Sequence, residues 1–197
     1  MINVSDEFKQ LMTERQDFKC NAEVTLANGT VLPLGEDDFS IDNNSLVDAA
    51  GANTIPLGVA LSRNVQLEIM NDDDHLSNYD FFGAKIRLYL TFELSETTEK
   101  IEYGTFTVTQ PETYGSVVTI VGYDDMYKAD KAYSTALTFP ATAKSVLIDS
   151  CDTCGILIGD SNFLHNDFQI PTMPSSEYTH RQIIGFIAMI ACGNARI

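Results

Sequence analysis

Apolar and polar residues alternate through the first two thirds of the chain and predict several short β-strands. From Ile86 to Leu94 every second residue is apolar, and the residues between them are Arg87, Tyr89, Thr91 and Glu93. A period of two places one face of a strand in a core and the other in water. Similar runs predict further strands at 65–69, 101–109 and 117–123.

Two more extended runs flank Asn28-Gly29, a dipeptide that favours a tight hairpin turn because both residues tolerate positive φ. Before them, Ser5 is a suitable N-cap for a short amphipathic helix with Phe8, Leu11 and Met12 on one side. The succession of short strands from about Lys19 to Tyr123 predicts a β-barrel or β-sandwich.

After residue 124 the pattern changes to that of helices. The stretch 124–133 predicts one or two helical turns. A longer helix is predicted to begin after Thr142 as N-cap and to stop at Gly155. A last helix begins after Thr179, which forms a capping-box pattern with Gln182, and is predicted to stop at Gly193.

The last helix is apolar on all sides, because no charged residue lies between Arg181 and Cys192. Such a helix needs cover on every side. We therefore predict that a partner chain, or a further part of a longer protein, covers it. The residues of this predicted assembly interface are Ile183, Ile184, Phe186, Ile187, Met189 and Ile190.

Charge divides the chain in the same place as the pattern. The formal charge of the 197 residues is −16; residues 1–124 carry −14 of it and residues 125–197 carry −2. We therefore expect a mainly β fold with α-helices (α+β) in two domains. Residues 1–124 would form an acidic β-barrel or sandwich domain with a short N-terminal helix. Residues 125–197 would form a smaller α/β domain, truncated at its C-terminus.

The composition also excludes some classes of function. A surface this acidic repels nucleic-acid phosphates and anionic lipid. The longest apolar run is about half the ~20 residues of a membrane span, and the N-terminus has no signal-peptide pattern. We expect a soluble protein, made in the cytosol and without a membrane anchor, whose four cysteines are reduced.

Asp72-Asp73-Asp74-His75 lies between two predicted strands and is either a metal site or an acidic turn. An EF-hand loop counted from Asp72 needs glycine at position six and glutamate at position twelve, where the chain has Ser77 and Gly83. Consecutive side chains on an extended segment point to opposite sides, which is poor geometry for a chelate. We interpret the stretch as an exposed connector.

The remaining candidate sites are also interpreted as structural. Cys151 and Cys154 lie on one helix face, but a zinc site needs two more ligands. Cys20 and Cys192 are available but lack the spacing of a second C-x-x-C or H-x-x-x-H pair. The pair lies at the end of its helix, away from the N-terminus where a dipole lowers a thiol pKa. His180 is too far from Cys192 along its helix for hydrogen bonding. We predict no catalytic residues, no metal and no cofactor, so the chain is not expected to be an enzyme.

The order of several short patterns resembles a known family. These patterns are Leu57-Gly58 through Asn71-Asp72-Asp73, Tyr79–Ile86, Tyr103–Val108, Gly122–Met126, and the helical stretches 139–156 and 178–197. Together they resemble the N-terminal part of phage and prophage tail structural proteins of the baseplate-hub or tail-tip kind. The resemblance covers most of the chain and includes no catalytic motif.

The resemblance implies a structural component of a virion tail, synthesised in the cytoplasm of a bacterial host. It implies a homo-oligomer, with a trimer favoured, that contacts other tail and baseplate proteins while DNA passes without specific binding. Two alternatives remain open. One is a carbohydrate- or receptor-binding β-sandwich module that uses the tyrosines Tyr89, Tyr103, Tyr114 and Tyr123. The other is a cell-wall hydrolase with converging carboxylates or a Cys–His pair.

Overall fold

The computed structural model describes residues 4–11, 13, 18–41, 43–49, 56–94, 97–110 and 114–197; Met12 of the expected first helix lies outside them. The chain forms two compact units. The first consists of Met1–Leu46 and Asn64–Tyr123, and the second of Val47–Arg63 and Asp124–Ile197.

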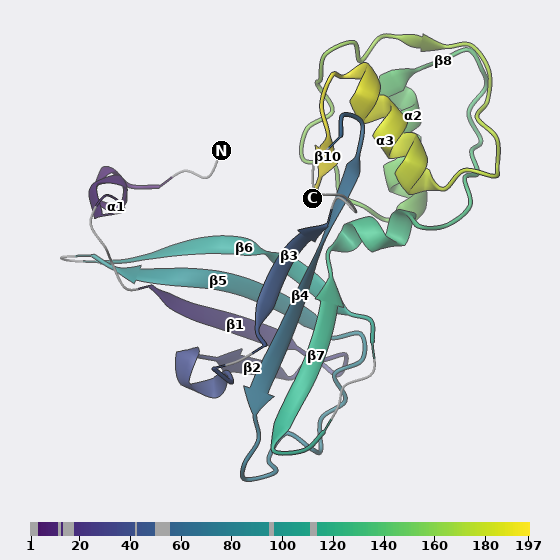
Figure 1. Cartoon of the computed structure of the whole chain (residues 1–197). Helices are drawn as coiled ribbons and strands as arrows, with labels where there is room; N and C mark the ends of the chain where they lie inside the picture. Colours follow the sequence, from purple (N-terminus) through teal and green to yellow (C-terminus); the bar gives the residue numbers. More distant parts are fainter. Residues whose placement is uncertain are drawn as a thin grey trace. The chain divides into compact units, whose positions relative to one another are not determined.

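A β-sheet makes up most of the first unit (Figure 1). Antiparallel neighbours follow the order β4–β7–β6–β5–β1–β2, and β3 pairs with β4. The strands are β1 (Lys19–Thr25), β2 (Val31–Leu34), β3 (Ser45–Ala49), β4 (Ala60–Met70), β5 (Lys85–Glu93), β6 (Thr98–Val108) and β7 (Val117–Tyr123). The strands expected from alternation are confirmed as β4, β5, β6 and β7.

The alternating residues form the core of this unit. In β5, Ile86 and Leu88 are buried while Lys85 and Arg87 are exposed. Burying each large aliphatic side chain contributes roughly 1.5–3 kcal/mol. The expected hairpin is also confirmed, since Gly29 adopts φ +86° between β1 and β2.

The expectation of a mainly β chain with helices is confirmed, but the sheet is not closed into a barrel. Among the described residues, β2 pairs with β1, β3 pairs with β4, and no pairing joins β2 to β3. Pro33 lacks the N–H that a further strand would need, as is common in edge strands. After Leu34 the chain enters a short 3-10 helix, η1 (Glu36–Asp38), and the Gly35 N–H donates to the Asp38 carboxylate at 2.7 Å. This turn takes the chain out of line with the sheet.

A short helix, α1 (Asp6–Leu11), packs against the ends of β5 and β6. The Phe8 ring meets Phe92 edge-on with centroids 4.7 Å apart, and Ile101 completes the cluster. Ser5 caps this helix as expected, because its hydroxyl accepts from the Phe8 N–H at 3.0 Å.

Two helices pack against each other in the second unit (Figure 1). They are α2 (Ala143–Cys154) and α3 (His180–Ile190). The other elements are a 3-10 helix, η2 (Asp125–Ala129), an antiparallel pair, β8 (Ala141–Thr142) and β9 (Gln169–Ile170), and β10 (Ala195–Arg196), which pairs in parallel with Ala60 and Leu61 of β4.

The capping residues expected for these helices are confirmed at three of four ends. Thr142 caps α2, and Gly155 ends it in the left-handed region at φ +66°. Thr179 and Gln182 form the capping box of α3. The predicted stop at Gly193 is wrong in detail, because Cys192 takes the left-handed position at φ +55°. Gly193 instead donates its N–H to the Ala188 carbonyl at 2.9 Å, as in a Schellman motif.

A buried carboxylate joins β4 to η2 within the second unit. Asp124 is 1% exposed, and its carboxylate accepts from the Ser62 hydroxyl at 2.9 Å, the Arg63 N–H at 2.7 Å and the Met126 N–H at 3.2 Å. Hydrogen bonds to a charged group are stronger than neutral ones, and a buried donor left without an acceptor is costly. This carboxylate therefore fixes the start of η2 against the strand.

Replacing Asp124 with alanine is expected to lower the free energy of unfolding by about 3 kcal/mol, because three buried donors lose their acceptor. Urea unfolding followed by far-ultraviolet circular dichroism measures the change. Asp125→Ala is the control, since Asp125 forms a partly exposed ion pair with Lys128 and should cost less than about 1 kcal/mol. Equal losses in the two variants would contradict the role given to Asp124.

Candidate functional site

Helix α3 divides the six residues of the predicted assembly interface between core and surface. The buried members, 1–3% exposed, are Ile183, Ile184 and Ile187. Ile190 is partly buried, whereas Phe186 and Met189 are 42% and 50% exposed. The second unit thus covers one side of the helix with its own chain, and only the side with Phe186 and Met189 remains on the surface.

Two glycines bring a distant segment onto this exposed side of α3. A Cβ placed on Gly185 would lie 2.7 Å from the Gly58 carbonyl oxygen, and one placed on Gly58 would lie 2.8 Å from the Met189 Cβ. Gly58 also adopts φ +82°, which side chains disfavour. The Gly58 N–H also donates to the carbonyl of Gly193, just after α3, at 3.0 Å, and this hydrogen bond holds Gly58 in place beside the helix.

Apolar side chains gather around the two glycines. Tyr178 and Phe186 stack edge-on with ring centroids 5.2 Å apart, and Leu57 precedes the glycine that contacts Met189. We call Leu57, Tyr178, Phe186 and Met189, which are 40–54% exposed, the α3 surface. Next to it lies a hollow of about 250 Å³ that is lined by Gly58, Val59, Ala60, Arg181, Gln182, Gly185 and Phe186.

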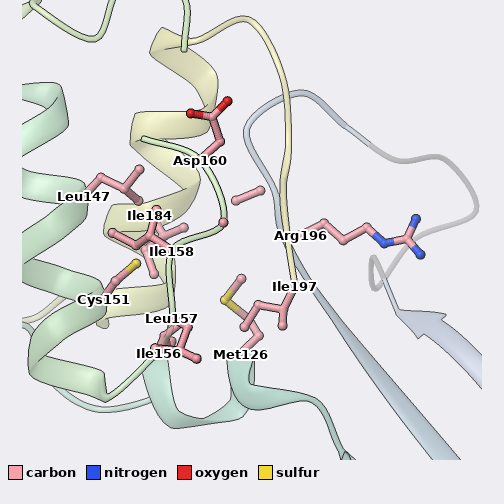
Figure 2. Close-up of a pocket in the computed structure, with 12 residues that line it drawn as sticks. Met126, Leu147, Cys151, Ile156, Leu157, Ile158, Asp160, Ile184, Arg196 and Ile197 are labelled. Carbon is pink, nitrogen blue, oxygen red and sulfur yellow. The ribbon is translucent and has the colours of Figure 1, made fainter. Parts of the chain in front are cut away.

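A second, more apolar pocket opens in the same unit (Figure 2). It has a volume of about 300 Å³ and is lined mainly by aliphatic and sulfur-containing residues. They come from η2, α2, the loop after α2, α3, β10 and the residue after β10: Met126, Leu147, Cys151, Ile156, Leu157, Ile158, Ile184, Ala195 and Ile197. Figure 2 shows the charged groups of Asp160 and Arg196 directed away from this lining. Leu157 is 92% exposed at its edge. The pocket can accept an apolar side chain, but its lining offers little for acid–base chemistry.

Charge separates the two units. The first has 19 Asp and Glu against 6 Lys and Arg, a formal −13, whereas the second has 9 against 6, a formal −3. The α3 surface and the apolar pocket therefore belong to the unit that is nearly neutral. Long-range repulsion between like molecules is weaker at such a surface than at the acidic one.

A buried histidine occupies the first turn of α3. His180 is fully buried beside Tyr133, with ring centroids 5.0 Å apart. Its Nε2 accepts from the Ser134 N–H at 3.3 Å, which places the proton of the neutral ring on Nδ1. Burial lowers the pKa of His180, the charge of Lys131 lowers it further, and Asp149 opposes the shift.

The acidic stretch after β4 is an exposed connector, as predicted. Asp72, Asp73, Asp74 and His75 are all exposed, and Asp73 bonds to His75. The loop is organised instead by buried Asn71, whose side-chain oxygen accepts from the Leu76 N–H at 2.8 Å and whose amide donates to the Gly115 carbonyl at 2.9 Å.

The four cysteines form no disulfide with one another in this structure. Cys151 and Cys154 are buried in the core of the second unit, and burial raises the pKa of the Cys151 thiol to about 11. Within the described residues, no three His, Cys, Asp or Glu side chains come together as metal ligands.

Two of the tyrosines named for the carbohydrate-binding alternative, Tyr103 and Tyr114, are 39% and 41% exposed. The Lys100 ammonium lies 3.4 Å from the centre of the Tyr89 ring, and the Tyr114 hydroxyl donates to the Tyr79 carbonyl.

In the part of the chain that the structure describes, no helix is long and apolar enough to cross a membrane.

The candidate surface could be found only partly from the sequence. The charge-free run pointed to Phe186 and Met189 but could not separate them from the buried isoleucines. Leu57 and Gly58 are more than a hundred residues from α3, and nothing in their sequence pattern indicates the contact with it.

No protein-family model and no curated protein matches the chain. Solved structures that it is similar to include three of a PdpA–VgrG complex, with 12% identity over 80% of this chain. They are the lidless complex (TM-score 0.41) and the lidded and half-lidded Francisella complexes (TM-scores 0.41 and 0.40). The chain spans only 28%, 23% and 25% of the lengths of the matched chains. Similarity this low does not assign the chain to a family.

Replacing Gly185 with alanine is expected to lower the free energy of unfolding by about 2 kcal/mol, because the new Cβ would overlap the Gly58 carbonyl oxygen. Thermal or urea unfolding measures the loss. Gly159→Ala is the matched control, since a Cβ there meets nothing within 4 Å. A Gly185 variant as stable as this control would show that the two segments do not approach so closely.

Acid is expected to destabilise the second unit through His180. The folded pKa lies below the 6.5 of an unperturbed histidine, so the unfolded state binds more protons as the pH falls through 6.5. Stability that is fully present above that pH is therefore lost as the pH falls toward the folded pKa. Urea unfolding at a series of pH values should show this slope, and His180→Asn should reduce it. His75→Gln, at an exposed histidine, should retain it; an unchanged slope in His180→Asn would exclude His180 as the cause.

Proposed function

We propose that this chain is a non-catalytic structural subunit of a phage or prophage tail, in the baseplate-hub or tail-tip assembly. In this proposal it forms a homo-oligomer, with a trimer favoured, and contacts other tail proteins. It is synthesised in the host cytoplasm and functions in the virion tail. The patterns from Leu57 to Ile197 that resemble such proteins support the identity of the assembly.

The α3 surface is the observation that carries the proposal. The rings of Tyr178 and Phe186 contact each other, and Gly58, which follows Leu57, contacts Met189. These four apolar residues are each 40–54% exposed on a unit of nearly neutral charge. Aromatic residues and methionine are enriched at protein interfaces, where charged residues are depleted. An adjacent hollow of about 250 Å³ offers a place for a side chain of the neighbouring subunit.

The acidic first unit supports the expected behaviour toward DNA. Binding to DNA gains most of its free energy from Lys and Arg that neutralise phosphates. A unit with a formal charge of −13 repels phosphates instead. Subunits of this charge arranged around a passage would let DNA move through without holding it.

The chemistry of the second unit favours a structural role over a hydrolytic one. The pocket in Figure 2 is lined mainly by aliphatic groups, and the Cys151 thiol at its wall has a pKa of about 11, so it is protonated at neutral pH. A cysteine in this state is a poor nucleophile. Its surroundings are those of a packing residue.

Replacing Phe186 with aspartate is expected to convert the oligomer to monomer, because it places a charge at the centre of the proposed contact. Multi-angle light scattering after size-exclusion chromatography measures the mass. Phe168→Asp is the matched control, since Phe168 is 52% exposed in the same unit but outside the α3 surface. A wild-type chain that is monomeric at every concentration tested, or equal dissociation of both variants, would contradict the proposal.

A further inference from the structure

A narrow apolar crevice lies in the first unit where the sheet remains open. Its volume is about 140 Å³, and it is lined by residues of β1, β3, β4 and β5 and of the turn before β3: Cys20, Asn44, Ser45, Leu46, Val65, Leu67 and Leu88. An aliphatic cavity of roughly 150 Å³ is large enough for a benzene-sized group. This crevice is therefore of a size to hold one aliphatic or aromatic side chain.

One wall of the crevice is a strand edge that β2 does not cover. β2 pairs with β1 only from Ala22 to Thr25. Across the hairpin, the Leu26 N–H donates to the Thr30 carbonyl at 2.8 Å. Because backbone groups alternate in direction along a strand, those of Cys20 point toward the same side as those of Leu26. Cys20 lies beyond the end of β2 and lines the crevice.

The charge around the crevice is predominantly negative. η1 contributes Glu36, Asp37 and Asp38 beside β1, all of them exposed. Burial raises the pKa of the Cys20 thiol, and Glu36 adds to that rise. The hydrogen bond and charge of Glu93 raise the pKa of Lys19, with smaller contributions from Glu36 and Asp37. Lys19 itself forms an ion pair with Glu93 at 2.7 Å. An occupant that carries positive charge would be complementary to this rim.

We infer that the crevice binds an extended segment of a partner protein, in which lysine or arginine alternates with apolar residues. The segment pairs with the outer edge of β1 beyond β2, as in β-strand addition. One apolar side chain enters between Leu46, Leu67 and Leu88, and the basic side chains lie against Glu36 and Asp37. This inference goes beyond the proposed function, because it concerns the first unit and does not require an oligomer.

Protection of Cys20 from alkylation tests the inference on the full chain. The Cys192→Ser variant removes the exposed thiol, so Cys20 becomes the accessible one, while Cys151 and Cys154 stay buried. The probe is a short synthetic peptide of alternating lysine and valine, and its counterpart alternates glutamate and valine. The lysine peptide is expected to slow alkylation of Cys20 at least about fivefold at saturation and to slow hydrogen exchange at its amide. The glutamate peptide should do neither.

Charge-reversal variants test where the peptide binds. Glu36→Lys with Asp37→Lys should weaken binding of the lysine peptide about tenfold. Asp72→Lys with Asp73→Lys makes the same change of net charge at the exposed loop after β4 and should leave binding within about twofold. Each rate is compared with that of the same variant without peptide, since Glu36 also influences the Cys20 thiol.

Three outcomes overturn the inference: no protection by the lysine peptide, equal protection by the glutamate peptide, or equal weakening by both charge-reversal pairs. The last would show attraction to net charge alone. None of these results depends on the oligomeric state, and the Phe186 variant does not alter the crevice. Failure of this inference is therefore distinguishable from failure of the proposed function.

Discussion

The hydrogen bonds of the Asp124 carboxylate are the interaction on which the second unit depends most directly. The carboxylate follows β7 and holds Ser62, Arg63 and Met126 through three bonds inside a site that is 1% exposed. A buried charge requires such partners, because without them its desolvation outweighs any packing gain. This one side chain thereby joins two stretches of chain that are far apart in sequence. Helices α2 and α3 both pack against η2, the element whose start this carboxylate fixes.

Short-range sequence patterns predicted the strands and helix ends, whereas long-range contacts determine whether the sheet closes and which distant segments meet. Alternation at 86–94 predicts β5 because a period of two is the side-chain period of a strand with one buried face. Thr142, Gly155 and Gln182 predict helix ends because capping involves only residues next to each other in sequence. The open sheet could not be anticipated in the same way. Closure depends on whether β2 and β3 can pair, and Pro33 and the turn into η1 act against it. The meeting of Gly58 and Gly185 likewise joins residues that have no shared pattern.

The charge-free last helix illustrates what composition alone can and cannot show. Its lack of charge correctly indicates that much of it is covered, since Ile183, Ile184 and Ile187 are buried. Composition does not say what covers a residue, and here the chain itself covers those three. Phe186 and Met189 are not covered in this way and remain 42% and 50% exposed. Beside them, Gly58 approaches α3 so closely that a larger side chain at Gly58 or Gly185 would not fit. On this helix the exposed large apolar side chains are therefore Phe186 and Met189.

The two candidate surfaces differ in the kind of partner that each can accept. Every copy of this chain carries the same acidic rim around the crevice, with Glu36 and Asp37 beside β1, so a second copy would bring like charges together there. That repulsion disfavours self-association through the open edge, a recognised hazard of unpaired strands, and favours a basic partner. The second unit has a formal charge of only −3, so the α3 surface can approach its own copy without this cost. In the two proposals made above, this division of charge would separate contacts between identical subunits, through the α3 surface, from contacts with a different protein, through the crevice.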